Sequence, residues 1–239
     1  MSTGKNKRYK GKTCVYCGVP KISNTGDHVL AREFVLERHR ARLPKVPACN
    51  PCNEKKSRLE HHLTSVMPFA ARHADAAENL VTMVPKRLAK NLPLRRSIEH
   101  TIAQRWLRDP SGLLVKTSTV HIEASALDMW VEMVVKGLVW HHWKVVTGTS
   151  HTVEVMRLHE NGAVFLKHGF AMRGERIAET IIGGGALSYE AQGVSDGLPT
   201  SIWRLSIYGG IEMAGEDPRV RTKETYVVIR SKDRVVPTD

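Results

Sequence analysis

The sequence predicts an α+β protein whose two halves differ in character. Two Cys-x-x-Cys pairs lie near the N-terminus, and helical patterns interrupted by proline follow them up to about residue 110. From Leu113 onward, alternating apolar and polar residues predict strands instead. The charge changes at the same place, since residues 1–110 hold 22 Lys and Arg against 9 Asp and Glu, whereas residues 111–239 hold 14 against 15. A basic N-terminal half therefore precedes a near-neutral C-terminal α+β domain.

The four cysteines, Cys14, Cys17, Cys49 and Cys52, predict a structural zinc site. Each Cys-x-x-Cys turn presents two thiolates, and two such turns complete the tetrahedral set of a closed zinc site. The 31 residues between Cys17 and Cys49 exceed the roughly 15–20 of a compact zinc ribbon, so an element of structure must be looped out between the pairs. Two disulfides or four separate buried thiols are the alternatives. The basic N-terminus has no apolar secretory segment, which favours zinc and a cytoplasmic location.

Composition divides the chain into four segments. Residues 1–12 hold five basic residues and no acidic one, which predicts a basic flexible arm. We expect the zinc module at residues 13–63, a basic helical connector at residues 64–110 and the α+β domain at residues 111–239. The turn sequence Asp109-Pro110-Ser111-Gly112 marks the last boundary.

The predicted order within the zinc module is strand, insertion, strand and helix. The first strand ends near His28, the second covers Lys45–Ala48, and the helix begins at about Pro51, because proline suits the first turn of a helix. The insertion Ala31–Arg42 is expected to be partly helical, with arginines that face either a phosphate backbone or solvent. The connector through residue 108 is predicted as helices broken at three prolines: Pro68, Pro85 and Pro93.

The C-terminal domain is predicted as one amphipathic helix packed on a sheet. Apolar residues recur at helical spacing over Ala126–His141. Strands are expected at Leu113–Ile122, Thr152–Leu158, Val164–His168, Ala186–Ala191, Ile202–Tyr208 and Thr225–Ile229. Gly183-Gly184-Gly185 predicts a turn. The apolar helix and the neutral charge lead to the hypothesis that a homodimer forms through this domain.

Asp27, His28 and Asn53 lie close to the zinc frame in the sequence and predict a hydrolytic site. A neutral imidazole, with an ordinary pKa near ~6.5, can take a proton from water at physiological pH, so His28 suits a general base. The side-chain oxygens of Asp27 and Asn53 suit a hard cation such as Mg²⁺ or Mn²⁺. The basic residues that follow Asn53 can reach phosphates: Lys55, Lys56 and Arg58.

The segments C-V-Y-C-G, G-D-H-V and V-P-A-C-N-P-C-N-E-K-K-S resemble the HNH (His-Asn-His) endonucleases, in particular the zinc-containing branch of the ββα-metal fold. The resemblance covers about residues 14–63. It implies an N-terminal zinc-stapled ββα-metal (His-Me finger) module. Pro44 is a departure, because many members of the family carry Asn at that place.

The resemblance also implies a role for each matching residue. His28 would be the general base at the end of the first strand. Asp27 and Asn53 would hold one catalytic divalent ion, Mg²⁺ or Mn²⁺, and the four cysteines would hold the structural Zn²⁺. The expected products of phosphodiester hydrolysis are a 5′-phosphate and a 3′-hydroxyl.

The charge distribution favours nucleic acid, and DNA in particular, as the partner. The net charge is +12, and the basic excess lies in the same half as the HNH-like motif. Besides the three basic residues after Asn53, we expect contacts from Arg32, Lys86 and Arg87. The sequence has no apolar run of about 18 residues, so no membrane-spanning segment is expected.

Two other functions fit parts of the same pattern. A catalytically inactive, zinc-dependent nucleic-acid-binding or regulatory module would keep the frame and the positive charge, but would not need Asp27, His28 and Asn53 together. A zinc-stapled scaffold for protein assembly would show no affinity for DNA. Salt-sensitive DNA binding separates the scaffold from the other two functions.

Overall fold

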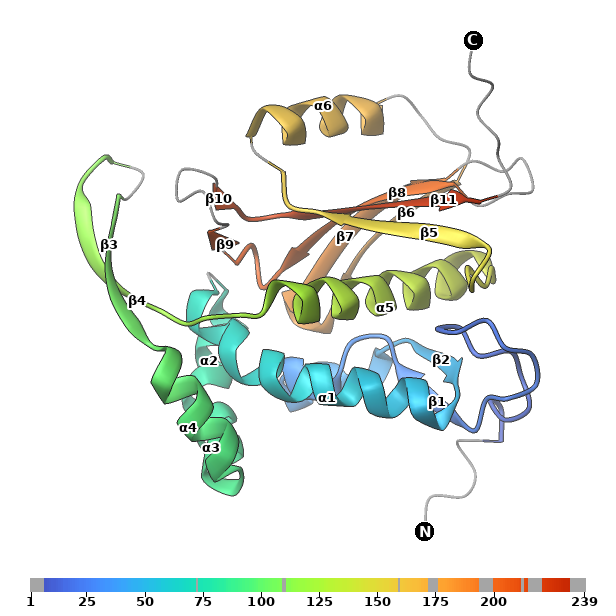
Figure 1. The fold of residues 1–239 in the computed structure, drawn as a ribbon, viewed down its shortest axis with the longest axis horizontal. Helices are drawn as coiled ribbons and strands as arrows, with labels where there is room; N and C mark the ends of the chain where they lie inside the picture. The colour runs from blue at the N-terminus through green and yellow to red at the C-terminus, as the bar shows by residue number, and fades with distance from the viewer. Residues whose placement is uncertain are drawn as a thin grey trace.

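The computed structural model describes residues 7–71, 73–108, 111–158, 160–171, 176–193, 200–211, 213–214 and 221–232. It confirms a mixed α and β architecture, arranged in layers (Figure 1). The N-terminal hairpin and helix α1 form one layer. The long helix α5 lies between this layer and a five-stranded sheet, and α6 covers the other face of the sheet. Segments far apart in the sequence therefore pack against one another in the interior of the protein.

The N-terminal layer has the predicted order of strand, insertion, strand and helix. Strands β1 (Thr25–His28) and β2 (Lys45–Ala48) pair antiparallel, with Asp27 opposite Val46 and His28 opposite Lys45. Helix α1 (Asn50–Val66) starts immediately after Cys49, and Pro51 occupies its first turn. Two short 3-10 helices, Arg32–Phe34 and Glu37–Arg42, make up the insertion, which confirms that it is partly helical.

The connector places each of its prolines in the first turn of a helix. Pro68 lies in a 3-10 turn, Met67–Ala70, and short helices follow: α2 (Ala74–Thr82), α3 (Val84–Lys90) and α4 (Leu92–Thr101). The prediction of helix through residue 108 is wrong at its end. Residues Ala103–Arg108 form strand β3, which pairs antiparallel with β4 (Leu114–Thr119) in a separate two-stranded ribbon.

Helix α5 (Ala124–Trp143) and the sheet confirm most of the predicted C-terminal elements. The sheet is antiparallel, in the order β5-β11-β8-β7-β6. Its strands are β5 (His151–Met156), β6 (Arg176–Ile182), β7 (Leu187–Gly193), β8 (Ser201–Ile207) and β11 (Thr225–Ser231). Strands β9 (Met213–Ala214) and β10 (Arg221–Thr222) form a short pair. The expected strand Val164–His168 is wrong, because this segment lies within helix α6 (Glu160–Ala171).

The hydrophobic core joins both halves of the chain. Phe34 of the insertion packs on Trp130 of α5 with ring centroids 5.2 Å apart, and the Tyr208 hydroxyl donates to the Phe34 carbonyl at 2.5 Å. Trp203 and Tyr208 are fully buried. The zinc module and the C-terminal domain thus share one core, although the boundary expected at residues 109–110 lies outside the described residues. No helix in the described part of the chain has the length and apolar character needed to cross a membrane.

The part of the N-terminal arm that is described is tied to the hairpin. Ser23 exchanges hydrogen bonds with Lys12, accepts one at its carbonyl from the Gly11 amide, and donates its hydroxyl to the Tyr9 carbonyl. The Tyr9 ring packs against Gly26 of β1, where an added Cβ would come within 2.3 Å of the ring. These contacts contradict a flexible arm at residues 9–12, and residues 1–6 lie outside the described residues.

Candidate metal centre and active site

The four cysteines gather in one cluster whose geometry fits a zinc ion. All four sulfur atoms lie within 4.8 Å of one another, and the Sγ atoms of Cys17 and Cys49 are 3.9 Å apart. Tetrahedral ligation with Zn–S bonds of about 2.3 Å places sulfurs about 3.8 Å apart, whereas a disulfide needs about 2.05 Å. No disulfide links the four thiols. Within the described residues, no other group of three or more His, Cys, Asp or Glu side chains gathers in this way.

Backbone hydrogen bonds build the first Cys-x-x-Cys turn around the sulfurs. The amide of Gly18 donates to the Cys14 carbonyl at 2.9 Å, and Gly18 takes a positive φ of 76° that a residue with a side chain would rarely adopt. The Cys49 amide donates to the Cys14 sulfur at 3.4 Å. Burial alone would raise the pKa of Cys14, but backbone donors from Cys17, Cys49 and Tyr16 outweigh it and lower the pKa. These amides favour the thiolate that a metal requires.

Asp27 is held by two partners at one of its oxygens. The hydroxyl of Tyr16, from the first cysteine turn, donates to Asp27 Oδ2 at 2.5 Å, and Lys56 Nζ lies 3.3 Å from the same atom. Burial and the adjacent Asp27 carboxylate raise the pKa of Tyr16 well above its usual value, so the phenol keeps its proton and donates. Asp27 Oδ1 has no partner among the described residues. One oxygen of Asp27 is therefore fixed, and the other is open to a ligand.

Lys56 is part of a buried ion network and does not lie at the surface. Its side chain is 0% exposed, and its Nζ reaches Glu60 Oε1 at 2.6 Å and the His28 carbonyl at 2.7 Å. Burial alone would lower the pKa of Lys56, but Asp27 and Glu60 raise it, so the ammonium stays charged. Trp130 of α5 donates its indole N–H to Glu60 at 3.2 Å. The expectation that Lys56 contacts a phosphate from the surface is thus corrected.

His28 is half-buried at the end of β1 and is neutral at physiological pH. Burial lowers the pKa of His28 to about 4, with a further lowering by Lys45 and a smaller opposing effect of Asp27. A neutral ring has a lone pair with which to accept a proton. The neighbouring positive charges of Lys45 and Arg32, which disfavour protonation of the ring, also give this edge of the hairpin a positive potential.

Asn53 lies in the first turn of α1 and is partly buried. Lys56, three residues further along, contacts Asp27, and residues three or four apart share a helix face, so we expect Asn53 on the same side of α1 as Lys56. Within the described parts of the chain, the Asn53 amide side chain makes no hydrogen bond. Asp27 Oδ1 and the Asn53 oxygen are hard donors, which fit Mg²⁺ or Mn²⁺ completed by water and phosphate oxygens.

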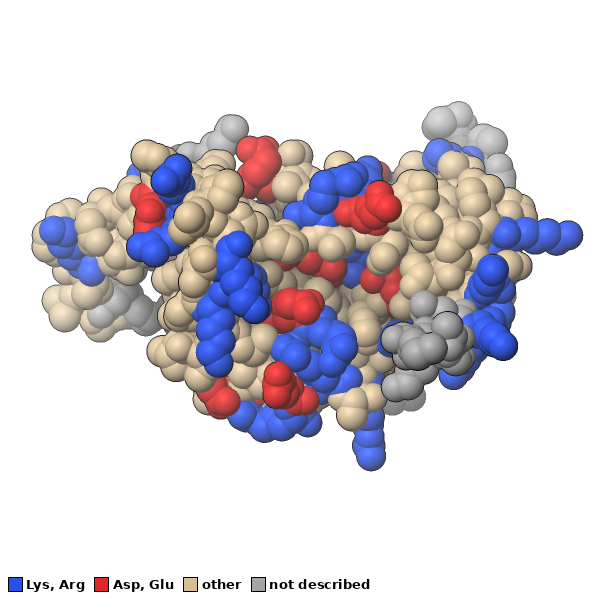
Figure 2. Space-filling view, turned by 90° about the horizontal axis from the view of Figure 1, so that it is seen from below, with Lys and Arg blue, Asp and Glu red and all other residues tan. Residues whose placement is uncertain are grey.

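The predicted basic contacts divide into exposed and internally bound residues. Lys55, Arg58, Arg32 and Lys86 are exposed. Arg87 instead donates from its guanidinium to the carbonyls of Thr64 at 2.5 Å and Glu33 at 3.2 Å, and burial lowers its pKa. Its expected role as a DNA contact is corrected, because its donors brace α1 and the insertion. Figure 2 shows Lys and Arg side chains spread along the face of the N-terminal half, with Asp and Glu between them.

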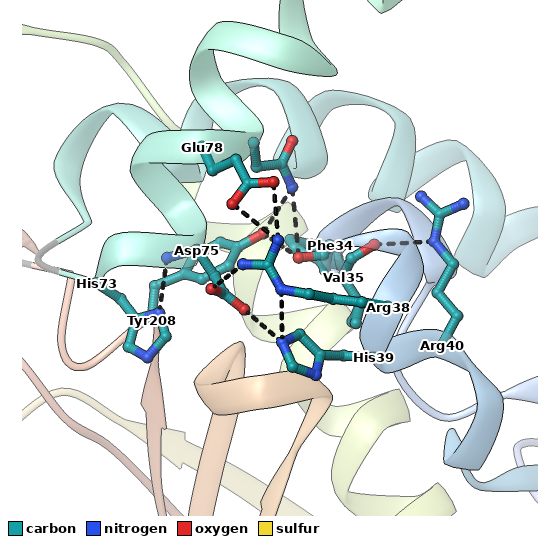
Figure 3. Close-up of polar contacts among 10 residues, drawn as sticks. Phe34, Val35, Arg38, His39, Arg40, His73, Asp75, Glu78 and Tyr208 are labelled. Carbon is teal, nitrogen blue, oxygen red and sulfur yellow. Dashed lines mark hydrogen bonds and ion pairs between the residues drawn. The ribbon is translucent and has the colours of Figure 1, made fainter.

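Two arginines of the insertion, Arg38 and Arg40, also bind groups of the protein itself (Figure 3). Arg38 pairs with both carboxylate oxygens of Glu78 at 2.8 Å and with Asp75 at 2.7 Å, and Arg40 donates to the carbonyls of Arg32 and Val35. His39 Nε2 lies 3.1 Å from Asp75 Oδ2. Of the insertion's arginines, Arg32 and Arg42 are exposed and have no acidic side-chain partner in the described part of the chain, so these two are the better placed to meet a phosphate backbone.

Sequence reasoning missed three residues that position Asp27: Tyr16, Glu60 and Trp130. Glu60 follows Lys56 by four residues, which is the spacing of a helical ion pair and would have been a usable signal. Tyr16 lies inside the quoted cysteine motif, but its sequence does not reveal the direction of its hydroxyl. Trp130 is 70 residues from Glu60, and no local pattern links the two.

Comparison with known proteins adds no relative from which a function could be transferred. The chain matches no known protein family, no curated protein and no solved structure.

Proposed function

We propose that this protein is a metal-dependent HNH-type endonuclease that hydrolyses phosphodiester bonds in DNA. One observation carries the proposal: Asp27 and His28 end the first strand beside the four-cysteine cluster, and the helix that begins at the same cluster brings Lys56 into contact with Asp27 and the His28 carbonyl, with Asn53 three residues before Lys56. Three kinds of group that hydrolysis needs, a base, hard oxygen donors and nearby positive charge, therefore meet within one small module.

His28 acts as the general base in this proposal. Because its ring is neutral, it can accept a proton from the attacking water, and burial keeps it from being protonated beforehand. Lys45 and Arg32 attract the phosphate to the same edge. A divalent ion held by Asp27 and Asn53 would supply charge stabilisation at the phosphate oxygens.

Tyr16 and Lys56 act as positioning residues. Both bind Oδ2 of Asp27, so they fix the carboxylate and leave Oδ1 for the ion. Because Tyr16 belongs to the cysteine turn, the structural zinc site would hold the ligand of the catalytic ion in place. This link gives the zinc cluster a defined task in the proposed site.

The Lys56–Asp27 contact also favours a second candidate. An ammonium 3.3 Å from the carboxylate already neutralises part of its charge, which weakens its attraction for a cation. A catalytically inactive, zinc-dependent nucleic-acid-binding module would tolerate such a contact at no functional cost.

Plasmid cleavage in the presence of Mg²⁺ or Mn²⁺ separates the two candidates. The comparison uses the wild type, His28→Ala and, as a matched control, His61→Ala, since His61 is exposed on α1. We expect cleavage by the wild type and by His61→Ala, and a loss of about 100-fold or more with His28→Ala, which is the usual effect of removing a general base. Zinc content and thermal unfolding establish that the variants remain folded.

Either of two results would overturn the nuclease proposal. If His28→Ala cleaves as fast as the wild type, the activity lies elsewhere. If none of the three proteins cleaves duplex, single-stranded or nicked substrates but all bind DNA in a salt-sensitive way, the inactive binding module is the function.

A further inference from the structure

The β3–β4 ribbon stands apart from the layered body (Figure 1). Its two strands have six residues each, so the ribbon is about 20 Å long at the usual rise of a strand. The strands pair with each other and carry large exposed side chains, with Trp106 65% and Leu114 61% exposed. An isolated two-stranded ribbon is at best marginally stable in water, and a group of large exposed apolar side chains such as Trp106, Leu114 and Val115 commonly marks an interaction site. These features indicate a surface that another molecule covers.

The charge of the ribbon identifies the kind of partner. Arg105 and Lys116 are exposed, and Lys116 lies directly opposite Trp106 in the register. The described residues of the two strands include no acidic side chain. The chain from residue 84 to residue 119, which comprises α3, α4 and the ribbon, holds eight Lys and Arg against two Asp and Glu. A second copy of this chain would bring like charges together, whereas a polyanion complements them.

The position of the ribbon relative to the candidate active site is set by α1. His62 of α1 lies against the backbone of His121, just after β4. Asn53 and His62 are nine residues apart on one helix, which corresponds to about 13 Å. The base of the ribbon therefore lies to one side of the candidate active site, in the direction of the C-terminal end of α1.

We infer that the β3–β4 ribbon is a nucleic-acid-binding arm that enters a groove of duplex DNA to one side of the cleavage site. The inference rests on the proposed function for the presence of DNA, and it supplies the recognition element that the HNH-like module lacks. The major groove of DNA admits a two-stranded ribbon of this kind. Arg105 and Lys116 contact phosphates, and Trp106 makes an apolar contact with base edges in the groove.

Binding of a labelled duplex, measured by fluorescence anisotropy without added divalent ion, tests the arm independently of cleavage. The charge variant is Arg105→Ser with Lys116→Ser, and its control is Arg230→Ser with Lys232→Ser, which removes the same charge from exposed sites on the sheet. The aromatic variant is Trp106→Ala, and its control is Phe165→Ala on α6, where Phe165 is 76% exposed.

We expect the charge variant to lower the slope of log affinity against log salt by about two, since each phosphate contact contributes about one. Trp106→Ala should weaken binding by about tenfold, as expected for the loss of a large apolar contact at an interface. Both control variants should bind as the wild type does.

Three outcomes would overturn the inference, and they are distinguishable from one another. If the wild type binds duplex DNA and both ribbon variants bind equally well, the arm is not a DNA contact although the proposed function stands. If the ribbon variants leave DNA binding unchanged but convert a dimer to a monomer in light scattering, the ribbon is an interface between copies of the chain. If the wild type binds no duplex at all, the proposed function fails together with the inference.

Discussion

Two ion networks tie together separate segments of this chain, and they differ chiefly in burial. The buried network consists of Asp27, Lys56 and Glu60, whose side chains are 12%, 0% and 10% exposed. The surface network consists of Arg38, Asp75 and Glu78, whose side chains are 50%, 14% and 45% exposed. The hydrogen-bond lengths in the two networks are alike, at 2.6–2.8 Å for the shortest contacts.

Contact distances alone therefore do not rank the two networks by their contribution to stability. Removal of one partner from a buried set leaves an uncompensated charge in a medium of low polarity, whereas water and salt replace a lost partner at the surface. The buried network also touches the candidate active site, and the surface network does not. Its members should therefore matter more for both stability and function.

The largest effect is expected from disrupting the four-cysteine cluster, whose geometry fits a zinc ion. Tyr16, which holds Asp27, lies within the first cysteine turn, so the turn must be closed for the contact to form. Cys49→Ser, or treatment of the wild type with a strong chelator, should remove bound zinc and unfold the N-terminal layer, at a cost on the order of 10 kcal/mol. Metal analysis together with thermal unfolding measures both effects. A Cys49→Ser protein that unfolds at the wild-type temperature would show that the cluster is not a structural metal site.

The next largest effect is expected from Lys56→Met. This change leaves the Asp27 and Glu60 carboxylates buried without their shared cation, so the free energy of unfolding should fall by about 3–5 kcal/mol. Lys55→Met is the matched control, because Lys55 is exposed one residue away and its loss should be nearly neutral. Urea unfolding gives both values. Equal stability of the two variants would mean that the buried network contributes no more than a surface lysine.

The third prediction concerns Gly184→Ala, which tests how closely the turn between β6 and β7 packs against Asp75 of the surface network. Gly184 lies in the turn between β6 and β7 at a φ of 67°, and a Cβ there would come within 2.5 Å of the His39 ring and 2.8 Å of Asp75 Oδ2. Gly11→Ala is a control with a similar φ of 71° and open space around it. The control should lose about 1–2 kcal/mol from backbone strain, and Gly184→Ala should lose about 1–3 kcal/mol more from the contact. If both lose the same amount, the turn is not tightly packed on Asp75.

The smallest effect is expected from Arg38→Met. Arg38 is half exposed, so the loss of its pairs with Asp75 and Glu78 should produce only a small shift of the unfolding midpoint. The shift should shrink further as salt is added, whereas the effect of Lys56→Met should persist. Unfolding curves of both variants at low and high salt make this comparison. A large, salt-independent effect of Arg38→Met would place the surface network in the same class as the buried one.

The sequence was sufficient for elements that have strong local signals. The cysteine spacing, Pro51 and the alternating residues of β8 each require particular local geometry, and the structure confirms the elements they predict. The sequence was misleading at Val164–His168, because a short apolar run fits either a strand or a buried helix. Strand β6 was missed, since its exposed Ile177 and Ile181 blur the pattern expected of a half-buried strand.

In the candidate site, too, some residues could be predicted from local sequence and others only from the fold. Asp27, His28 and Asn53 could be selected from their order around the cysteines, but whether they act together stays a prediction. Lys56 was expected to reach a phosphate, whereas its side chain is fully buried and paired within the protein. Its partners come from β1 and from its own helix, and only the fold brings Asp27 to it.

The Trp130–Glu60 hydrogen bond makes the N-terminal module dependent on the C-terminal half of the chain. A zinc-stapled module of about fifty residues is the sort of unit that can be moved from one protein to another. Here, however, an indole from α5 completes the polar network beneath Asp27, and Phe34 packs on the same ring. The module therefore depends on contacts with α5, and transfer of the module to another protein would have to include α5.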